Sequence, residues 1–242
     1  MQEVFQEVSF NMVSLQHFPN LLEVWIMDQP NVEIRGLNAS PALEVLGIMG
    51  CGVAKISGLE KNVNLRKLYL CNNNSDKKIS NIENIAHLEN LEVLHLHNNN
   101  IEDTAGLEGL FNLKDLNLAV NKIRTISRGL KHLTQLKSLN LSGNNISDLN
   151  EIAHLSSLTQ LRDVAFGDPH FRSCPLCLLN NYRVFAVHFL PQLEVLDTFK
   201  LSHDDKKEAR LAYFLRKMRH GMHVKKLHRE SVRTISISCT QK

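Results

Sequence analysis

Aromatic residues are scarce in this chain: they make up 6% of its 242 residues, while apolar residues as a whole make up 43%. A core that is rich in leucine and poor in rings is typical of a small unit that packs repeatedly. Long apolar runs are missing as well. No stretch reaches 18 apolar residues, so the sequence predicts no membrane-spanning helix. The first eleven residues carry Glu3 and Glu7 and no basic segment before an apolar one, which argues against a secretory signal peptide.

Cysteine and net charge are also limited. Five cysteines are an odd number in a chain without a predicted signal, so we expect reduced thiols in a cytosolic-type compartment. The net charge is only +3, but residues 203–233 hold ten Lys/Arg against four Asp/Glu. The body is therefore mildly acidic and the tail is basic. An acidic body argues against nucleic acid as the partner.

A leucine pattern runs through the first two thirds of the chain. The spacing L-x-x-L-x-L-x-x-N begins six times, at steps of 22, 22, 26, 22 and 23 residues. The four later units match it in full, and the two earlier ones carry Gln29 and Cys51 in the asparagine place. The units begin at Leu21, Leu43, Leu65, Leu91, Leu113 and Leu136.

Each part of this spacing has a structural reason. Two leucines two residues apart lie on one face of a short strand, and no unit can bury that face alone. The asparagine turns inward after the strand, where its amide satisfies backbone groups that the bend exposes. A 22-residue unit leaves room on its return path only for 3₁₀ turns or one short helix. The spacing therefore predicts an α/β fold: a right-handed leucine-rich-repeat solenoid of six or seven units, with parallel strands on its concave face.

We expect the repeats to occupy residues 1–160. Met12, Leu15 and Phe18 fit the convex positions of a unit whose start is missing, so Met1 falls inside an incomplete repeat. Terminal units normally carry a cap. We therefore expect either that the chain is a fragment or short variant of something longer, or that a partner covers this end.

The pattern changes after Leu161, and residues 161–200 are predicted to form a C-terminal cap. The changed stretch contains Asp168-Pro169, Tyr182-Arg183, Leu190-Pro191 and Leu193-x-x-Leu196-Asp197. It resembles the cap of the Sds22-like leucine-rich-repeat family. The resemblance implies a helix over residues 180–189, which buries Val184, Val187 and Leu190, and then a closing strand.

Over about residues 15–205 the chain resembles one group of this family in particular, whose members are much longer. The resemblance rests on Phe18-Pro-Asn-Leu21, Lys114-Asp-Leu-Asn-Leu-Ala119 and the run from Cys174 to Tyr182. It implies a cytoplasmic setting, ciliary or cytoskeletal. It also implies an alternative function, the regulation of protein phosphatase 1 in the manner of Sds22.

Strand residues that point away from the core are expected to line the concave face. Trp and Tyr are favoured anchors of protein interfaces. We therefore predict a scaffold or adaptor that binds protein partners through this face. The alternative is ordinary packing of neighbouring strand residues along the sheet. The predicted binding residues are Trp25, Met27, Met49, Tyr69, His95, His97, Asn117 and Asn140.

Two short patterns raise the question of metal binding. His95 and His97 lie two apart on a strand, but no third ligand follows at a fixed spacing, so we interpret them as polar surface residues. Cys174 and Cys177 have the C-x-x-C spacing, but zinc would need a second pair and redox chemistry a βαβ context. We expect partly buried thiols in a cap loop. No phosphate-binding loop, G-x-S-x-G or H-E-x-x-H occurs, so we expect neither an enzyme nor a cofactor nor a metal.

Residues 201–230 are predicted to form a basic trailing helix with Ser202 as its N-cap. Its apolar positions form a partial stripe: Ala209, Ala212, Tyr213, Leu215, Met218 and Met222. Such a helix is typical of calmodulin targets, of segments that bind an acidic surface such as tubulin, and of membrane-surface helices. We expect instead that residues 204–218 pack on the cap and that no membrane is bound. Residues 231–242, which are rich in Ser and Thr, are predicted to be disordered.

Overall fold

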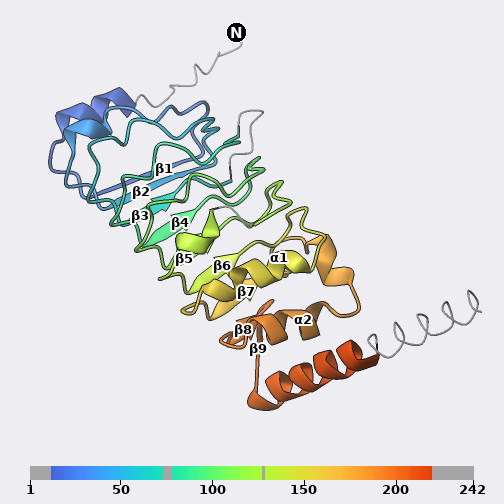
Figure 1. Ribbon diagram of the computed structural model, residues 1–242. Coiled ribbons are helices and arrows are strands. Elements are labelled where there is room, and N and C mark those ends of the chain that lie inside the picture. The colour runs from blue at the N-terminus through green and yellow to red at the C-terminus, as the bar shows by residue number, and fades with distance from the viewer. Residues whose placement is uncertain (1–11, 73–77, 127–128, 220–242) are drawn as a thin grey trace, which may run out of the picture.

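Short parallel strands stack side by side along one face of the molecule (Figure 1). The computed structural model describes residues 12–72, 78–126 and 129–219. Within these ranges nine strands form one sheet, in sequence order, and this confirms the predicted leucine-rich-repeat solenoid. Seven strands pair in parallel and in register: β1 (Glu23–Met27), β2 (Val45–Met49), β3 (Lys67–Tyr69), β4 (Val93–His95), β5 (Asp115–Asn117), β6 (Ser138–Asn140) and β7 (Asp163–Ala165).

The return path of each unit is a turn or one short helix, as the length of the unit predicts. One helical turn, α1 (Asn150–Ala153), lies on the convex side together with 3₁₀ helices. The 3₁₀ helices are η1 (Met12–His17), η2 (Leu37–Ala39), η3 (Leu130–His132), η4 (His154–Ser157) and, near the cap, η5 (Pro175–Leu178).

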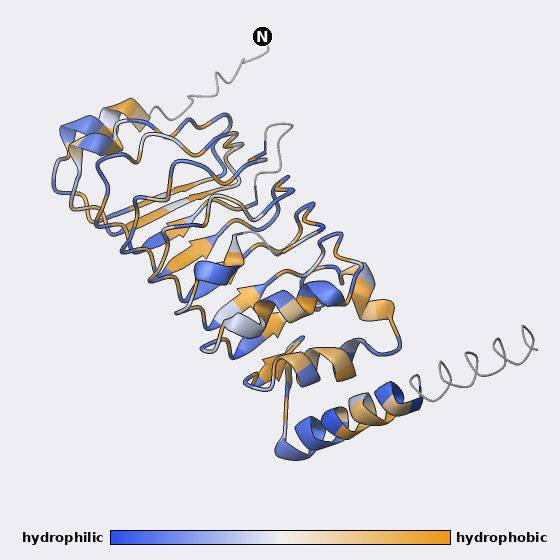
Figure 2. Ribbon diagram, in the orientation of Figure 1, coloured by the Kyte–Doolittle hydropathy of each residue, from blue (hydrophilic) through white to orange (hydrophobic). Residues whose placement is uncertain are grey.

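Leucines fill the space between the strands and the convex turns. In Figure 2, hydrophobic residues recur both along the strands and along the return path of each unit. Leu94 and Leu96 of one unit are completely buried, as are their counterparts Leu116 and Leu118 in the next. Full burial of a leucine side chain contributes about 1.5–3 kcal/mol. The array is therefore stabilised by many similar contributions, each shared between neighbouring units.

The asparagines that follow the strands form a hydrogen-bonded ladder through the core. The amide nitrogen of Asn121 donates to the carbonyls of Leu96 (3.0 Å) and Leu118 (2.9 Å). Its Oδ1 accepts the N–H of Ile101 at 2.9 Å. The predicted inward turn of the asparagine is therefore confirmed, and each ladder residue ties its own unit to the one before. The same bonds recur at Asn99 and Asn144.

The cap closes the array through a carboxylate. β8 (Val195–Leu196) pairs in parallel with β7, and β9 (Phe199–Lys200) pairs with β8 in the antiparallel direction. At the turn after β8, Oδ1 of Asp197 accepts the N–H groups of Phe166 (2.8 Å) and Gly167 (2.9 Å). Oδ2 of Asp197 accepts the hydroxyl of Tyr182 at 2.6 Å. The two most distinctive parts of the cap pattern therefore meet in space.

The cap helix α2 (Tyr182–Phe189) begins later than the predicted residues 180–189. Val187 and Leu190 are buried as expected, but the prediction for Val184 was wrong, because this residue is only half-buried. Val184 lies instead at the grooves that separate α2 from the helix that follows the cap. Tyr182 and Ala186 take the inward positions.

Residues 203–219 form a helix after β9, which we call the post-cap helix; it lies at the lower end of Figure 1. Its Tyr213 ring stacks on His188 of α2 with ring centroids 3.8 Å apart, which confirms that this helix packs on the cap. Several predictions concern residues outside the described ranges. They are those for residues 1–11, for Asn73 as the asparagine of the third unit, for residues 220–230 of the predicted helix, which include Met222, and for residues 231–242.

Candidate functional site on the concave face

Gly47 leaves room on the concave face for a ring from the neighbouring strand. In the register of the sheet it lies between Trp25 on β1 and Tyr69 on β3. A Cβ atom on Gly47 would lie 2.1 Å from Cε3 of Trp25, so the indole lies directly over this glycine. The indole thereby reaches Tyr69, with ring centroids 5.2 Å apart and an interplanar angle of 29°.

The contact between these two rings continues along the sheet. Tyr69 meets His95 edge to face at 5.0 Å, and His95 meets His97 at 6.2 Å. His97 then packs against Phe171, from the loop after β7, at 5.6 Å. These separations fall within the range of favourable ring pairs. We call the five residues Trp25, Tyr69, His95, His97 and Phe171 the ring row.

The ring row is accessible at its N-terminal end. Trp25 remains 46% exposed and Met27, beside it on β1, remains 52% exposed. Met49, the equivalent residue on β2, is half-buried, and Val45 is buried although its position points away from the leucine core. The predicted surface therefore divides into an exposed edge on β1 and a more closely packed centre.

His97 is not the solvated surface histidine that the sequence predicted. Its side chain is half-buried, and its Nδ1 atom is inaccessible and has no hydrogen-bond partner among the described residues. Burial, and to a smaller extent the neighbouring His95, lower the pKa of His97 to about 4. The ring is therefore neutral near pH 7 and adds an uncharged surface to the row.

Carboxylates gather on the C-terminal half of the concave face. Asp115 on β5 lies 3.3 Å from Nε2 of His95. Burial raises the pKa of Asp163 on β7, and the nearby carboxylates of Asp115 and Asp168 raise it further. Among the described residues, no Lys or Arg forms an ion pair with these three groups. The concave face thus combines a row of rings, exposed at its β1 end, with carboxylates on β5, on β7 and in the loop after β7.

Asn117 and Asn140 are both half-buried and serve the backbone. Oδ1 of Asn117 accepts the N–H of Ala119 at 3.0 Å, and Oδ1 of Asn140 accepts the N–H of Ser142 at 2.9 Å. The amide nitrogen of Asn140 also lies 3.3 Å from Oδ2 of Asp168. These contacts account for both residues as supports of the turn that follows each strand. A role in partner binding remains a prediction.

Cys51 and Cys174 are buried and donate hydrogen bonds to backbone carbonyls. The Cys51 thiol donates to the carbonyl of Met49 at 3.1 Å, in the ladder place that the sequence assigned to it. Cys174 does the same in a later unit, with its thiol donating to Leu141 at 3.1 Å. Burial raises the pKa of Cys174 to about 11 and of Cys177 to about 12. Both thiols are therefore protonated near neutral pH, and the described residues contain no cluster of three or more His, Cys, Asp or Glu placed to hold a metal ion.

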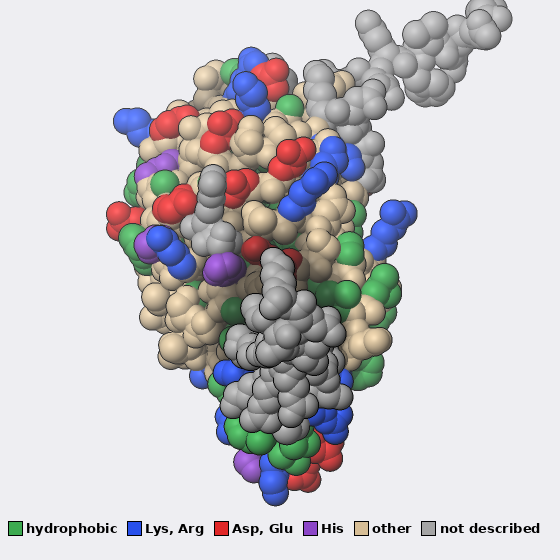
Figure 3. All heavy atoms as spheres, turned by 45° about the vertical axis from the view of Figure 1, so that its right-hand side comes forward, with side chains coloured by type: hydrophobic (Ala, Val, Ile, Leu, Met, Phe, Trp, Pro, Cys, Tyr) green, Lys and Arg blue, Asp and Glu red, His purple; other side chains and the backbone are tan. Residues whose placement is uncertain are grey.

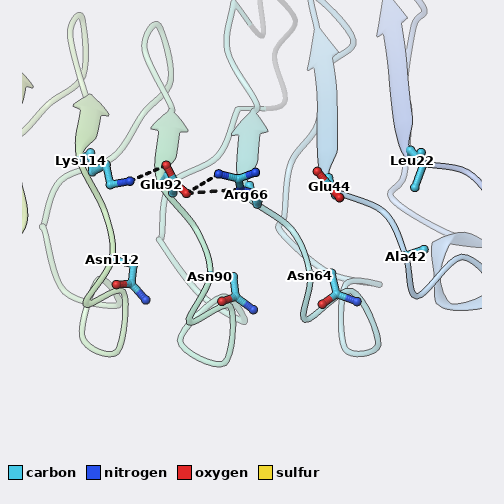
Figure 4. Close-up of a pocket in the computed structure, with 9 residues that line it drawn as sticks. All are labelled: Leu22, Ala42, Glu44, Asn64, Arg66, Asn90, Glu92, Asn112 and Lys114. Atoms are coloured by element: carbon cyan, nitrogen blue, oxygen red, sulfur yellow. Dashed lines mark hydrogen bonds and ion pairs between the residues drawn. The ribbon is translucent and has the colours of Figure 1, made fainter.

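A hollow of about 420 Å³ lies at the start of the strands (Figure 4). Glu92 bridges Arg66 and Lys114 there, at 2.7 Å from each. Below these three charged residues in Figure 4, three asparagines each donate to a carbonyl of the preceding unit. They are Asn64, Asn90 and Asn112, which donate to Pro41, Val63 and Glu89. Every one of these contacts joins neighbouring units, so we interpret the hollow as a structural seam.

Sequence reasoning missed two residues of the ring row's architecture. Gly47 was visible as a glycine in a strand between Trp25 and Tyr69, where a missing side chain often marks the close approach of another group. Phe171 gave no signal, because it lies in a loop beyond the last regular unit and only the fold brings it to His97.

Comparison with known proteins places this geometry in context. A family model described as leucine-rich repeat matches residues 64–227. Dynein axonemal assembly factor 11 of Trypanosoma brucei brucei is 41% identical over 121 residues, which are 50% of this chain and 30% of that protein. Leucine-rich repeat-containing protein 56 of Rattus norvegicus is 35% identical over 88 residues, 36% of this chain and 15% of that protein. Centrosomal protein of 72 kDa of Mus musculus is 30% identical over 139 residues, 57% of this chain and 17% of that protein.

The chain therefore spans less than a third of the length of each of these relatives. Among solved structures, internalin C2 of Listeria monocytogenes superposes with a TM-score of 0.60 at 24% identity, covering 78% of this chain and 76% of that one. A second internalin from the same species gives a TM-score of 0.58 at 22% identity, covering 73% of this chain and 47% of that one. Both share the fold. Within the described residues, no helix is long and apolar enough to cross a bilayer.

Proposed function

Because the chain belongs to the leucine-rich-repeat family, we propose that it is a protein-binding scaffold or adaptor whose concave ring row holds the partner. The ring row is the observation that carries this proposal. Five rings in sequential contact form an extended surface with little conformational freedom to lose, and Trp and Tyr are the residue types that dominate binding energy at interfaces.

The chemistry of the face specifies the partner segment. Trp25, Tyr69 and the neutral His97 favour an apolar or aromatic side chain, since all three present uncharged ring surface. The carboxylates of Asp115 and Asp163 lie further along the same sheet and favour a Lys or Arg. The partner thus places an apolar anchor on the ring row and a basic residue toward β5–β7.

The relatives support a setting for this binding. Their names place one in axonemal dynein assembly and another at the centrosome. The cap pattern is also similar to that of the longer leucine-rich repeat-containing protein 9 group. Together these similarities support a cytoplasmic location, at cilia or the cytoskeleton, and a role within a larger protein or complex. It acts there by binding and not by catalysis.

The test is affinity capture with three forms of the chain: wild type, the double variant Trp25→Ala/Tyr69→Ala, and the control Phe111→Ala. Phe111 is an exposed aromatic residue outside the ring row. Proteins that the wild type and the control retain, and that the double variant loses by about tenfold or more, are partners of the row. Equal capture by all three forms would exclude the ring row. Capture of the protein phosphatase 1 catalytic subunit in the same pattern would favour the phosphatase-regulatory alternative.

A further inference from the structure

The post-cap helix is anchored on one side only. Ser202 caps its first turn: the hydroxyl oxygen accepts the N–H of Asp205 at 3.1 Å, and the N–H of Ser202 donates to the Asp205 carboxylate at 2.8 Å. Ala209 is buried against the cap. Tyr213 stacks on His188 and meets Phe185 edge to face at 6.2 Å. These contacts hold one side of the helix against the cap. The residues on its opposite side therefore face solvent.

That opposite side is apolar. Leu211, Phe214, Leu215 and Met218 are each 43–58% exposed. Their spacing is i, i+3, i+4 and i+7, which places them along one stripe of a helix. The single stripe predicted from the sequence was therefore wrong. Ala209, Ala212 and Tyr213 turn toward the cap, while Leu215 and Met218 belong to this second, outward stripe.

The flanks of the outward stripe are positively charged. The charged residues around the stripe, Arg210, Arg216, Lys217 and Arg219, are all basic, whereas the first turns of the helix hold Asp204, Asp205 and Glu208 beside Lys206 and Lys207. Arg216 turns back to Asn181 of the cap, and the other three basic residues around the stripe are exposed. Figure 3 shows apolar side chains gathered at the lower end of the molecule, over this helix, with Lys and Arg and also Asp and Glu beside them. A second copy of the helix would bring like charges together, which disfavours self-association through the stripe.

We propose that the outward stripe binds an amphipathic helix of a partner protein, one that carries a leucine-type stripe flanked by Asp and Glu. Anchors at i, i+3, i+4 and i+7 are the pattern by which helices dock on apolar surfaces, and the basic flanks select acidic neighbours. The partner covers only this face. A protein that encloses the whole helix would have to break the contacts of Tyr213 and Ala209 with the cap. This docking surface is independent of the ring row.

A synthetic peptide tests the proposal directly. The probe is a fluorescein-labelled helical peptide with Leu at i, i+3, i+4 and i+7 and Glu on both flanks, and its binding to the full chain is measured by fluorescence anisotropy. We expect the double variant Leu211→Ser/Leu215→Ser to weaken binding at least tenfold. The control Leu178→Ser should leave binding unchanged, because Leu178 is 84% exposed and lies outside the stripe. Exchanging Glu for Lys in the peptide should abolish binding.

Four outcomes would overturn the proposal. They are no binding of the Glu peptide, equal binding of the Glu and Lys peptides, unchanged binding by the double variant, and self-association of the chain through the stripe in sedimentation experiments. Vesicles containing phosphatidylserine are measured in parallel. Capture by the vesicles that the double variant loses, without capture of the peptide, would assign the stripe to a lipid surface instead. Because both stripe residues are exposed, circular dichroism should show an unchanged fold in the double variant.

Discussion

The indole of Trp25 and the phenol of Tyr69 stack although a whole strand separates them. The register of the sheet places Gly47 between the two residues, and the indole occupies the space that a side chain at this position would need. An alanine at this position would put its Cβ within 2.1 Å of the indole. One hydrogen atom in place of a side chain therefore determines whether the ring row is continuous.

Gly47→Ala should displace the Trp25 ring and break the row at its N-terminal end. Trp25 is the single tryptophan of the chain, so its fluorescence reports the change directly. We expect a red-shifted emission maximum and a loss of about 1 kcal/mol in the free energy of unfolding, the usual contribution of one ring pair. Val93→Ala, a concave strand residue on β4, is the control. An unchanged emission spectrum in Gly47→Ala would contradict the stacking.

His97 should make the stability of the fold depend on pH. Its folded pKa of about 4 lies below the ordinary value of 6.5, so the unfolded chain binds the proton more readily between these two values. The contribution of the neutral ring is fully present above pH 6.5 and is lost as pH falls toward 4. We expect a loss of about 1–3 kcal/mol over this window, and His97→Phe should remove most of it. Denaturant unfolding at pH 7, 5.5 and 4.5 measures the effect, and exposed His132→Phe should retain it.

Glu92 should respond at lower pH and to salt. Hydrogen bonds from Lys114 and Arg66 lower the pKa of Glu92 to about 2. The ion pairs therefore stabilise the fold above about pH 4.5, and this stabilisation disappears as pH falls toward 2. Because the pairs are partly solvated, we expect only about 1 kcal/mol, reduced further by 1 M NaCl. Glu92→Gln should flatten the unfolding free energy over this range, whereas exposed Glu89→Gln should not.

The ladder should be the most sensitive polar element of the fold. Asn121→Ala removes an amide that serves Leu96, Leu118 and Ile101, and it leaves their buried backbone groups without partners. We expect a loss of about 2–4 kcal/mol in unfolding free energy. Asn112→Ala, which removes one exposed bond to Glu89, should cost less than about 1 kcal/mol. Similar losses for the two variants would mean that the ladder has no special role.

The bond between Tyr182 and Asp197 should stabilise the cap. Tyr182→Phe keeps the buried ring and removes the hydroxyl that donates to the carboxylate at 2.6 Å. Asp197 retains its two backbone donors, so we expect a loss of about 1–2 kcal/mol rather than unfolding of the cap. Hydrogen exchange of the Phe166 and Gly167 amides, compared with wild type, would localise the change. Unaltered exchange of these two amides would mean that the Tyr182 hydroxyl does not stabilise the turn at Asp197.

The sequence predicts the array well because its constraint is periodic. One leucine spacing specifies the strand positions, the inward asparagines and the short convex turns, and the structure has all three. The same rule placed Cys51 in the ladder. Cys174 takes the same role in a unit of irregular spacing, and the sequence did not indicate it.

The site was predictable only in part because contacts between side chains are not periodic. Alternation along the strands brought Trp25, Tyr69 and His95 to one face, but it carries no information on which rings touch. The contact of His97 with Phe171 depends on the conformation of the loop after β7, which the repeat spacing does not specify. On the post-cap helix, the composition indicated an apolar stripe, but the packing of Tyr213 divided it into an inward and an outward side.

The antiparallel turn from β8 to β9 limits how copies of this molecule associate. Fibre growth by sheet extension requires a free strand at both ends of the sheet, so that each added copy presents a new template. At this end the chain folds back on itself, and β9, the last strand among the described residues, is only two residues long. The cap therefore blocks head-to-tail polymerisation through the sheet, even if another strand pairs with β1 at the opposite end of the array.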